Sequence, residues 1–282
     1  MVRGSCLCGD VAWEIDAELK QSHACHCTIC RKLHGTAYGA YAVVVAEGFR
    51  FSRGGEHKQS YPSTATGHRW FCPRCGSVLP EPHTAAGRVG IPIGTLDDAG
   101  PELRMLAHIF VTSKLPWLDI TDSLPRFEAW PSGVGLKVHS TPVRGGGRGS
   151  ERTITGSCLC DRVGYALSRP PARMRHCHCS RCRKARAAPH ATNAYTDLAG
   201  FRFTRGEDEL TSYRVPDARY FASVFCRTCS APMPRVDPSR DLVVIPGGSF
   251  DDDPGVRPTE HIHVGSKAAW FEISDDLKQR VE

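Results

Sequence analysis

The sequence predicts a mostly β protein made of two tandem domains, each built from short antiparallel strands and held together by clustered cysteines. Three observations carry this prediction. A cysteine pattern occurs twice and accounts for all 14 cysteines of the chain. A wider sequence repeat surrounds both copies, and short segments with alternating apolar residues are separated by glycine and proline.

Each copy of the cysteine pattern has a Cys-x-Cys pair, a Cys-x-Cys-x-x-Cys motif and a Cys-x-x-Cys pair. An odd number of thiols per copy would leave one thiol without a disulfide partner inside that copy. The first residues form no apolar signal-peptide core, so we expect a cytoplasmic protein with reduced thiols. Metal binding is therefore favoured over the alternative, an extracellular disulfide framework.

The repeat extends beyond the cysteines. Residues 4–8 (GSCLC) recur at 156–160, and residues 49–54 (FRFSRG) recur as FRFTRG at 201–206. Two copies of this length suit one compact domain each.

These matches set the domain boundaries that we predict. The first domain covers residues 1–138, and the second covers residues 153–282. Residues 139–152 are rich in Gly, Ser and Arg without apolar periodicity, which is typical of a flexible linker.

The strands expected within each copy are short. Residues 11–15 (VAWEI) alternate apolar and polar side chains, as do residues 49–51, and this pattern favours half-buried strands. Long helical periodicity is absent. We expect short helical turns only just after Cys30 and Cys182, where Arg-Lys follows the cysteine.

The composition is that of an ordinary globular protein, with 40% hydrophobic residues, 23% charged residues and a net charge of +6. No run approaches the ~18 apolar residues of a membrane helix, so no membrane partner is expected. Basic residues gather around the second Cys-x-Cys-x-x-Cys motif, namely Arg169, Arg173, Arg175, Arg181, Arg183, Lys184 and Arg186. We interpret this cluster as a solvated face, with a site for an anionic ligand as the alternative.

Thiolates in this number and spacing indicate zinc, which takes four ligands in a tetrahedral shell. A Cys-x-Cys pair and a distant Cys-x-x-Cys pair together supply four thiolates from two loops. We predict two closed structural sites of this kind, one formed by Cys6, Cys8, Cys72 and Cys75 and the other by Cys158, Cys160, Cys226 and Cys229. The domains would then be zinc-pinned, because such sites contribute directly to folding.

The Cys-x-Cys-x-x-Cys motifs supply three thiolates each. Three protein ligands leave one tetrahedral position open, which is typical of a catalytic zinc. The candidate catalytic ligands are Cys25, Cys27 and Cys30 in the first copy and Cys177, Cys179 and Cys182 in the second.

Histidines lie beside these candidate ligands. His26 and His178 stand between two cysteines, and His23 and His176 are close by. Each could complete the zinc shell or move protons, although a histidine that faces solvent or bonds the backbone is favoured. A second structural site closed by such a histidine is the alternative for each motif.

These residues resemble the family of glutathione-dependent formaldehyde-activating enzymes and the related centromere protein V. The resemblance rests on residues 4–9 (GSCLCG), 25–32 (CHCTICRK), 72–76 (CPRCG) and the closing stretch 108–127. It implies a β-tent-like fold with one structural and one labile catalytic zinc per domain, and it assigns both three-cysteine motifs to catalytic zinc. It also implies glutathione as a co-substrate and a carbon–sulfur lyase resembling S-hydroxymethylglutathione synthase.

The second copy departs from the family pattern at three glycines. Gly9, Gly35 and Gly76 are replaced by Asp161, Ala187 and Ser230. Glycine often serves turns that need a positive φ, so we expect altered loop geometry there. The second copy is then either a structural partner with a weakened site or a site adapted to another ligand.

The leading functional prediction is a zinc-dependent carbon–sulfur lyase acting on a thiol adduct of an aldehyde or a related small molecule. The alternative is a non-catalytic glutathione or zinc carrier. A nucleic-acid binder is not favoured, because the chain has no long basic tail. The duplication suggests an intramolecular pseudo-dimer, in which Trp117 and Trp270 are core aromatics or, alternatively, line a ligand cleft.

Overall fold

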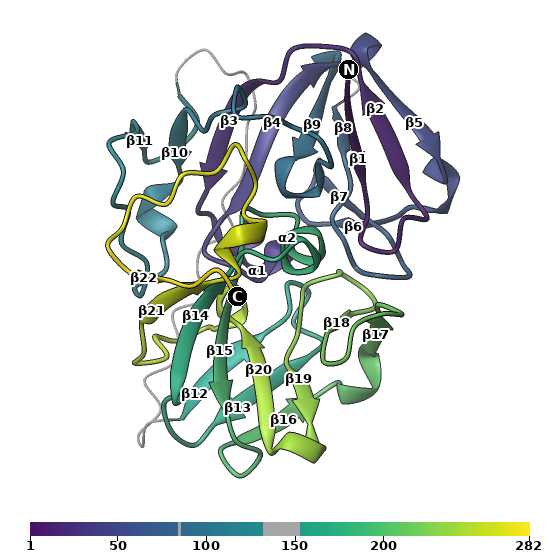
Figure 1. The fold of residues 1–282 in the computed structure, drawn as a ribbon. Helices are drawn as coiled ribbons and strands as arrows, with labels where there is room; N and C mark the ends of the chain where they lie inside the picture. The colour runs from purple at the N-terminus through teal and green to yellow at the C-terminus, as the bar shows by residue number, and fades with distance from the viewer. Residues whose placement is uncertain (84–85, 132–152) are drawn as a thin grey trace.

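The computed structural model describes residues 1–83, 86–131 and 153–282 and is mostly β, with two sheet-rich halves (Figure 1). The predicted fold class is confirmed in these terms. The linker predicted at 139–152 and the predicted domain end at 138 lie outside the described residues. No helix in the described part of the chain is long and apolar enough to cross a membrane.

The first half contains one three-stranded sheet, one six-stranded sheet and one hairpin. The three-stranded sheet has the order β1-β2-β5, the six-stranded sheet the order β11-β10-β3-β4-β9-β8, and β6 pairs with β7. The strands are β1 (Val2–Ser5), β2 (Ala12–Ile15), β3 (Lys20–Cys25), β4 (Gly39–Val45), β5 (Phe49–Arg53), β6 (Gln59–Pro62), β7 (His68–Phe71), β8 (Glu81–His83), β9 (Arg88–Pro92), β10 (Ala107–Ile109) and β11 (Arg126–Phe127).

The second half repeats this topology strand for strand. Its sheets have the orders β12-β13-β16 and β19-β20-β15-β14-β21-β22, and β17 pairs with β18. The strands are β12 (Ile154–Ser157), β13 (Gly164–Leu167), β14 (Arg173–Cys177), β15 (Ala191–Thr196), β16 (Phe201–Arg205), β17 (Leu210–Arg214), β18 (Ala222–Cys226), β19 (Arg235–Asp237), β20 (Leu242–Pro246), β21 (Pro258–Ile262) and β22 (Lys278–Gln279).

The pairing is antiparallel except at one end of each large sheet. There β10 runs parallel to both β3 and β11, and β21 runs parallel to both β14 and β22. We expected mostly antiparallel strands, and the sequence did not indicate these parallel pairs. The pairs of β10 with β3 and of β21 with β14 join segments that are more than 80 residues apart in the chain.

Two α-helices, α1 (Thr28–His34) and α2 (Ser180–Arg186), lie at the centre of the molecule between the two halves (Figure 1). Each begins directly after a cysteine whose Sγ caps it, because the thiol of Cys27 accepts a hydrogen bond from the Cys30 N–H and Cys179 does the same for Cys182. Each ends at a residue in the left-handed conformation, Gly35 or Ala187. The helices therefore include Cys30 and Cys182, whereas we expected the helical turns to begin after these cysteines.

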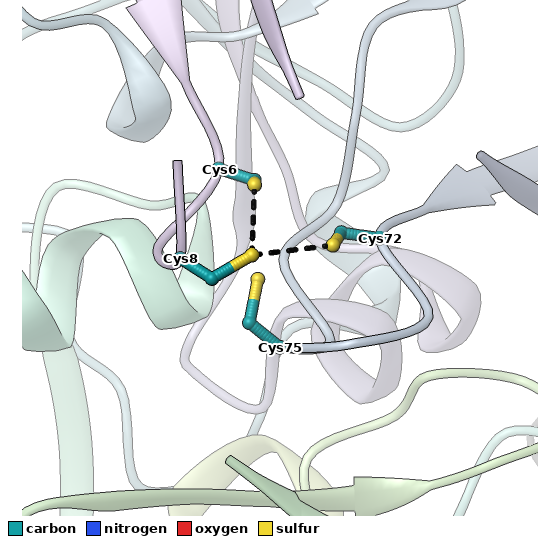
Figure 2. Close-up of side chains that lie close together, drawn as sticks. All are labelled: Cys6, Cys8, Cys72 and Cys75. Atoms are coloured by element: carbon teal, nitrogen blue, oxygen red, sulfur yellow. Dashed lines mark hydrogen bonds between the residues drawn. The ribbon is translucent and has the colours of Figure 1, made fainter. Parts of the chain in front are cut away.

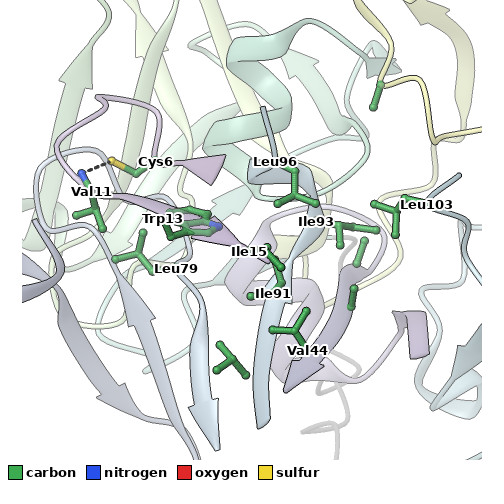
Figure 3. Packing of buried hydrophobic residues seen from close by; sticks show 14 of the residues in the cluster. Cys6, Val11, Trp13, Ile15, Val44, Leu79, Ile91, Ile93, Leu96 and Leu103 are labelled. Carbon is green, nitrogen blue, oxygen red and sulfur yellow. Dashed lines mark hydrogen bonds between the residues drawn. The ribbon is translucent and has the colours of Figure 1, made fainter. Parts of the chain in front are cut away.

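The two hydrophobic cores exchange residues between the halves. The core of the first half, built around Trp13, Ile15 and Ile91 (Figure 3), also contains Ala268 and Trp270. The core of the second half likewise contains Leu115 and Trp117 from the first half. Trp117 is 2% exposed and Trp270 is 6% exposed, so both are core aromatics. Trp270 also contributes to the lining of a pocket of about 400 Å³.

The helices also cross between the halves. The buried Lys32 ammonium of α1 donates to the Ser157 carbonyl at 2.8 Å and to the Asp251 carboxylate at 2.5 Å, and Arg31 donates to the Phe250 carbonyl at 2.8 Å. On α2, Lys184 and Arg183 make the equivalent bonds back to the first half, to Ser5, Asp97 and the Leu96 carbonyl. Pairs of equivalent contacts related in this way are typical of two-fold symmetry.

Candidate metal centres

The first cysteine group brings together the two outer pairs of the first half. Cys6 and Cys8 come from the loop after β1, and Cys72 and Cys75 come from the loop after β7 (Figure 2). Their Sγ atoms all lie within 4.8 Å of one another, with Cys8 at 3.4 Å from Cys6 and 3.6 Å from Cys72. Ordinary zinc–sulfur bonds give tetrahedral sulfur–sulfur distances of about 3.8 Å, so this donor set fits zinc.

The second half forms the same group from Cys158, Cys160, Cys226 and Cys229. The Sγ of Cys160 lies 3.5 Å from that of Cys158 and 3.7 Å from that of Cys226. Backbone N–H groups point at a sulfur in both groups, from Val11 to Cys6 at 3.4 Å and from Val163 to Cys158 at 3.3 Å. Such donors favour the thiolate, which is the form that binds metal.

The two three-cysteine motifs gather at the N-terminal ends of the helices. Cys25, Cys27 and Cys30 form one group and Cys177, Cys179 and Cys182 form the other, with all Sγ atoms of a group within 4.8 Å. Both groups follow a strand of a large sheet, β3 or β14, and then enter the helix. Among the described residues, no histidine or carboxylate joins either group, so each offers three ligands.

One cysteine in each three-cysteine group favours the thiolate. Hydrogen bonds from Cys177 and Cys182 lower the pKa of Cys179 to about 2, and Cys25 and Cys30 lower the pKa of Cys27 in the same way. The cause is crowding of thiols, because neighbours that keep their protons donate them to a shared anion. This is the donor chemistry that a thiophilic cation needs.

The histidine inside each motif turns away from the sulfurs and enters a buried hydrogen-bond chain. His26 Nε2 lies 2.8 Å from His108 Nδ1, and His108 Nε2 lies 2.9 Å from the Asp122 carboxylate. The carboxylate can only accept, so His108 donates from Nε2 and accepts at Nδ1, and His26 donates from Nε2. The Nδ1 atom of His26 is then a buried acceptor without a protein partner.

The second half repeats this chain with His178, His261 and Asp275, at 2.8 Å and 2.9 Å. Burial, and then the neighbouring histidine, lowers the pKa of His26 and of His178 to about 3, so both are neutral at physiological pH. The sequence analysis did not assign roles to His108, Asp122, His261 or Asp275. These four residues occur at matching positions in the two copies, and this repeat could have indicated them. The two histidines lie more than 80 residues from the cysteine motifs, so nothing local in the sequence connects them to His26 or His178.

The remaining predicted histidines do not approach the thiols as ligands. His176 Nδ1 lies 2.9 Å from Thr192 Oγ1 in the core of the large sheet. His23 packs edge-on against Trp130, with ring centroids 4.9 Å apart. His176 also lies near His261 and Asp275, but both ring nitrogens of His261 already have hydrogen-bond partners.

The basic cluster predicted around the second motif divides into several environments. Arg169 and Arg175 pair with Asp197 and Glu260. Arg183 and Lys184 bond to the other half, as described above. Arg181 and Arg186 instead line a pocket of about 400 Å³ that contains Cys177, Cys179 and Cys182. The interpretation of the whole cluster as a solvated face is therefore too simple.

The three glycine replacements leave the loop geometry in place. Asp161, Ala187 and Ser230 have φ values of 65°, 49° and 62°, close to the 78°, 60° and 76° of Gly9, Gly35 and Gly76. A side chain in this region costs about 1 kcal/mol, and two of the three side chains form hydrogen bonds. Ser230, for example, donates to the Gly76 carbonyl of the other half at 2.7 Å. The expectation of altered loops was wrong for the backbone.

A comparison with protein families agrees with the repeat. The model of the family described as "Glutathione-dependent formaldehyde-activating enzyme" matches residues 1–113 and again residues 153–266. A protein of Halomonas elongata, named "Putative glutathione-dependent formaldehyde-activating enzyme", is 28% identical over 129 residues, which cover 43% of this chain and 81% of the relative. A crystal structure of a Rhodobacter sphaeroides protein aligns at 25% identity with a TM-score of 0.28, covering 36% of this chain and 92% of that one.

Proposed function

We propose that this chain, which belongs to the family of glutathione-dependent formaldehyde-activating enzymes, is a zinc-dependent carbon–sulfur lyase acting on an aldehyde adduct of a glutathione-type thiol. The observation that carries the proposal is the contrast between two kinds of cysteine group. Two groups supply four thiols and are complete tetrahedral donor sets, whereas two groups supply three thiols and leave one position for a ligand.

The proposed reaction adds a thiol to an aldehyde. A carbon–sulfur bond forms between the thiol sulfur and the carbonyl carbon, the carbonyl π electrons move to oxygen, and the thiol proton is transferred to that oxygen. The product is a hemithioacetal, and the reverse reaction returns thiol and aldehyde. No oxidant or reductant is required, which suits a site made of thiols alone.

The chain's own residues would hold and orient the site. Cys25, Cys27 and Cys30, or Cys177, Cys179 and Cys182, would bind zinc, which when bound lowers the pKa of a thiol ligand and so supplies a nucleophilic thiolate. The loop that carries the first motif is fixed to the sheet, because the His26 N–H donates to the Ile109 carbonyl at 3.0 Å. The His178 N–H makes the same bond to Ile262 at 3.0 Å.

The proposal extends to the organisation of the protein. We infer two domains at residues 1–138 and 153–282 with up to two zinc ions each, one held by four cysteines and one by three. Unpaired thiols in this number suit a reducing compartment such as the cytoplasm.

The test is the rate at which glutathione and formaldehyde exchange with S-hydroxymethylglutathione, measured by exchange NMR at equilibrium. We expect zinc-loaded protein to accelerate exchange in proportion to its concentration, and the double variant Cys30→Ser, Cys182→Ser to lose this acceleration. Saturable glutathione binding without faster exchange would contradict the proposal and indicate a carrier.

A further inference from the structure

The surroundings of the three-cysteine groups differ between the halves. In the first half, Cys25, Cys27 and Cys30 are each only 5% exposed and pack in one cluster with Tyr41 and Phe110. Trp130 covers this cluster, with its ring centroid 6.2 Å from that of Phe110. Among the described residues, apolar and aromatic side chains therefore fill the space next to these thiols.

Polar groups around the first site are paired with one another. The Tyr41 hydroxyl lies 2.6 Å from His34 Nε2, and Arg69 forms an ion pair with Glu81 in which both side chains are buried. Burial opposes the charge of Arg69, but Glu81 and then Cys30 raise its pKa above the ordinary value. Among the residues that the structure describes, the buried polar groups named here are therefore already paired.

The equivalent positions of the second half carry different side chains. His34, Tyr41, Arg69, Glu81 and Phe110 become Arg186, Asn193, Ser223, Arg235 and His263. These replacements remove the aromatic packing and the internal ion pair. A pocket of about 400 Å³ takes their place, within the range typical of small-molecule sites, and Cys179 and Cys182 are partly exposed to it.

This pocket is strongly basic. Its lining includes Arg181, Arg186, Arg219, Arg235 and Arg240 but no aspartate or glutamate. The nearest carboxylate contacts are with Asp237, which lies 3.4 Å from Arg235 and 3.7 Å from Arg240 and so is shared by two guanidinium groups. In the part of the chain that the structure describes, the five arginines that line this pocket thus have one shared carboxylate partner, Asp237.

Arg186 is the deepest of these charges. Burial lowers its pKa to about 10, so it remains a cation at neutral pH, and its contact with Asn193 Oδ1 is long at 3.5 Å. Arg186 is partly buried and has no carboxylate partner among the described residues, so an anion that entered the pocket would find an uncompensated guanidinium. Its planar donors match a carboxylate, which makes Arg186 a specificity-determining candidate.

The outer arginines are held by aromatic rings. Arg219 and Arg240 lie over the Tyr220 ring at 4.8 Å and 4.5 Å, and Arg181 lies 6.0 Å from the centre of the Phe221 ring. Such stacking orders the guanidinium groups without neutralising them. Tyr220 lies in a loop that is two residues longer than its counterpart in the first half. The offset between equivalent cysteines of the two copies accordingly changes from 152 to 154 residues.

We propose that the two sites are not equivalent: the second half takes an anionic thiol, whose carboxylates bind Arg186 and Arg235, and the first half's three-cysteine site is closed to it. This inference rests on the proposed function for the identity of the thiol as co-substrate. It assigns ligand binding to the copy that departs furthest from the family pattern.

The test is calorimetric binding of two thiols to the zinc-loaded full chain, glutathione as the anionic probe and 2-mercaptoethanol as the neutral probe. Arg186→Gln and Arg235→Gln should each raise the Kd of glutathione about tenfold or more, the size of one lost charge-assisted hydrogen bond, and leave the Kd of 2-mercaptoethanol nearly unchanged. Arg186→Lys should retain part of the preference. Arg202→Gln removes an exposed arginine of β16 and should change neither value.

A second comparison assigns the site to one half. Cys182→Ser should abolish glutathione binding, whereas Cys30→Ser should retain it, with circular dichroism and the content of the other zinc sites confirming that both variants fold. The inference would be overturned if Cys30→Ser alone lost glutathione binding. It would also be overturned if the arginine variants weakened the binding of glutathione and of 2-mercaptoethanol equally. Arginine-dependent binding without exchange of formaldehyde would overturn the proposed function and leave this inference standing.

Discussion

His34 uses one ring nitrogen to contact the second half and the other to contact the first half. Nδ1 lies 2.7 Å from the Arg186 carbonyl, to which it must donate, and Nε2 lies 2.6 Å from the Tyr41 hydroxyl, from which it accepts. Burial lowers the pKa of His34 to about 4. The neutral imidazole is therefore the form that the folded protein requires.

The pH dependence of stability follows from this residue. Because the folded pKa lies below the unfolded value of about 6.5, the stabilisation is complete above pH 6.5 and is lost as the pH falls towards 4. The loss attributable to His34 is up to about 3 kcal/mol. Chemical unfolding at matched zinc content should show a shallower acid loss for His34→Gln, and identical slopes for both proteins would contradict this.

The left-handed positions give a second prediction at this scale. A Cβ on Gly35, at φ 60°, would lie 2.9 Å from the Cβ of Pro232, so Gly35→Ala combines backbone strain with a clash and should cost about 2–4 kcal/mol. The reciprocal Ala187→Gly relieves strain but loses a buried methyl group, so it should change stability by less than about 1 kcal/mol. Thermal unfolding distinguishes them, and similar shifts for the two variants would be inconsistent with this account.

At the residue scale, the structure brings together the cysteines that the sequence spacing groups. The spacing of Cys6 and Cys8, or of Cys72 and Cys75, identifies donor pairs because two or three residues of loop can aim both thiols at one point. The partners of His26 were out of reach, because nothing local indicates that His108 and Asp122 return to the same place. The prediction that replacing Gly9 by Asp161 alters the loop was wrong, because Asp161 adopts the same backbone conformation and forms hydrogen bonds with Arg205.

At the scale of elements, the short helices connect one half's three-cysteine group to the other half's four-cysteine group. The Lys184 carbonyl of α2 accepts a hydrogen bond from Ser77 Oγ at 3.0 Å. Ser77 Oγ in turn accepts from the Leu7 N–H at 3.0 Å and lies 3.4 Å from Cys75 Sγ. Helix α2 is therefore bonded to the loops that carry the four-cysteine group of the first half.

Lys32 is the residue on which this connection should depend most. Lys32→Met leaves the Ser157 carbonyl and Asp251 without their buried partner, so we expect a loss of about 2–4 kcal/mol in unfolding free energy. Lys278→Met, at an exposed position of β22, is the matched control and should shift stability by less than about 0.5 kcal/mol. Equal effects of the two substitutions in urea unfolding would show that the crossing contact is unimportant.

The sequence predicted the presence of helical turns near Cys30 and Cys182 but not their placement between the halves. We expected Arg183 and Lys184 to belong to a solvated face, because basic clusters are usually solvated. For Arg31 and Lys32 we expected only a helical turn, and the structure buries both against the other half. Their burial depends on carbonyls and carboxylates such as Asp251, which are supplied by a segment more than 200 residues away.

At the scale of the whole molecule, each half completes the core of the other through Trp117 and Trp270. The two halves should therefore behave as one particle. Small-angle scattering should give a radius of gyration of about 19 Å, the value for a compact chain of this length. A substantially larger value with the profile of two separate bodies would contradict the exchanged cores.

The exchange of core residues also sets the limit of sequence-based prediction at this scale. The repeat predicts two similar halves, and duplication alone suggests that they associate. It does not indicate which copy of Trp117 or Trp270 enters which core, because either tryptophan satisfies the same local pattern.

The central claim is that the chain holds two kinds of zinc site, one with four cysteine ligands and one with three. Native mass spectrometry of the zinc-replete chain tests this most directly, with wild type compared against Cys30→Ser and Cys182→Ser. The account predicts four zinc ions per chain, with one ion lost in each variant and a glutathione adduct that disappears only in Cys182→Ser. Two zinc ions per chain, unchanged in both variants, would contradict it.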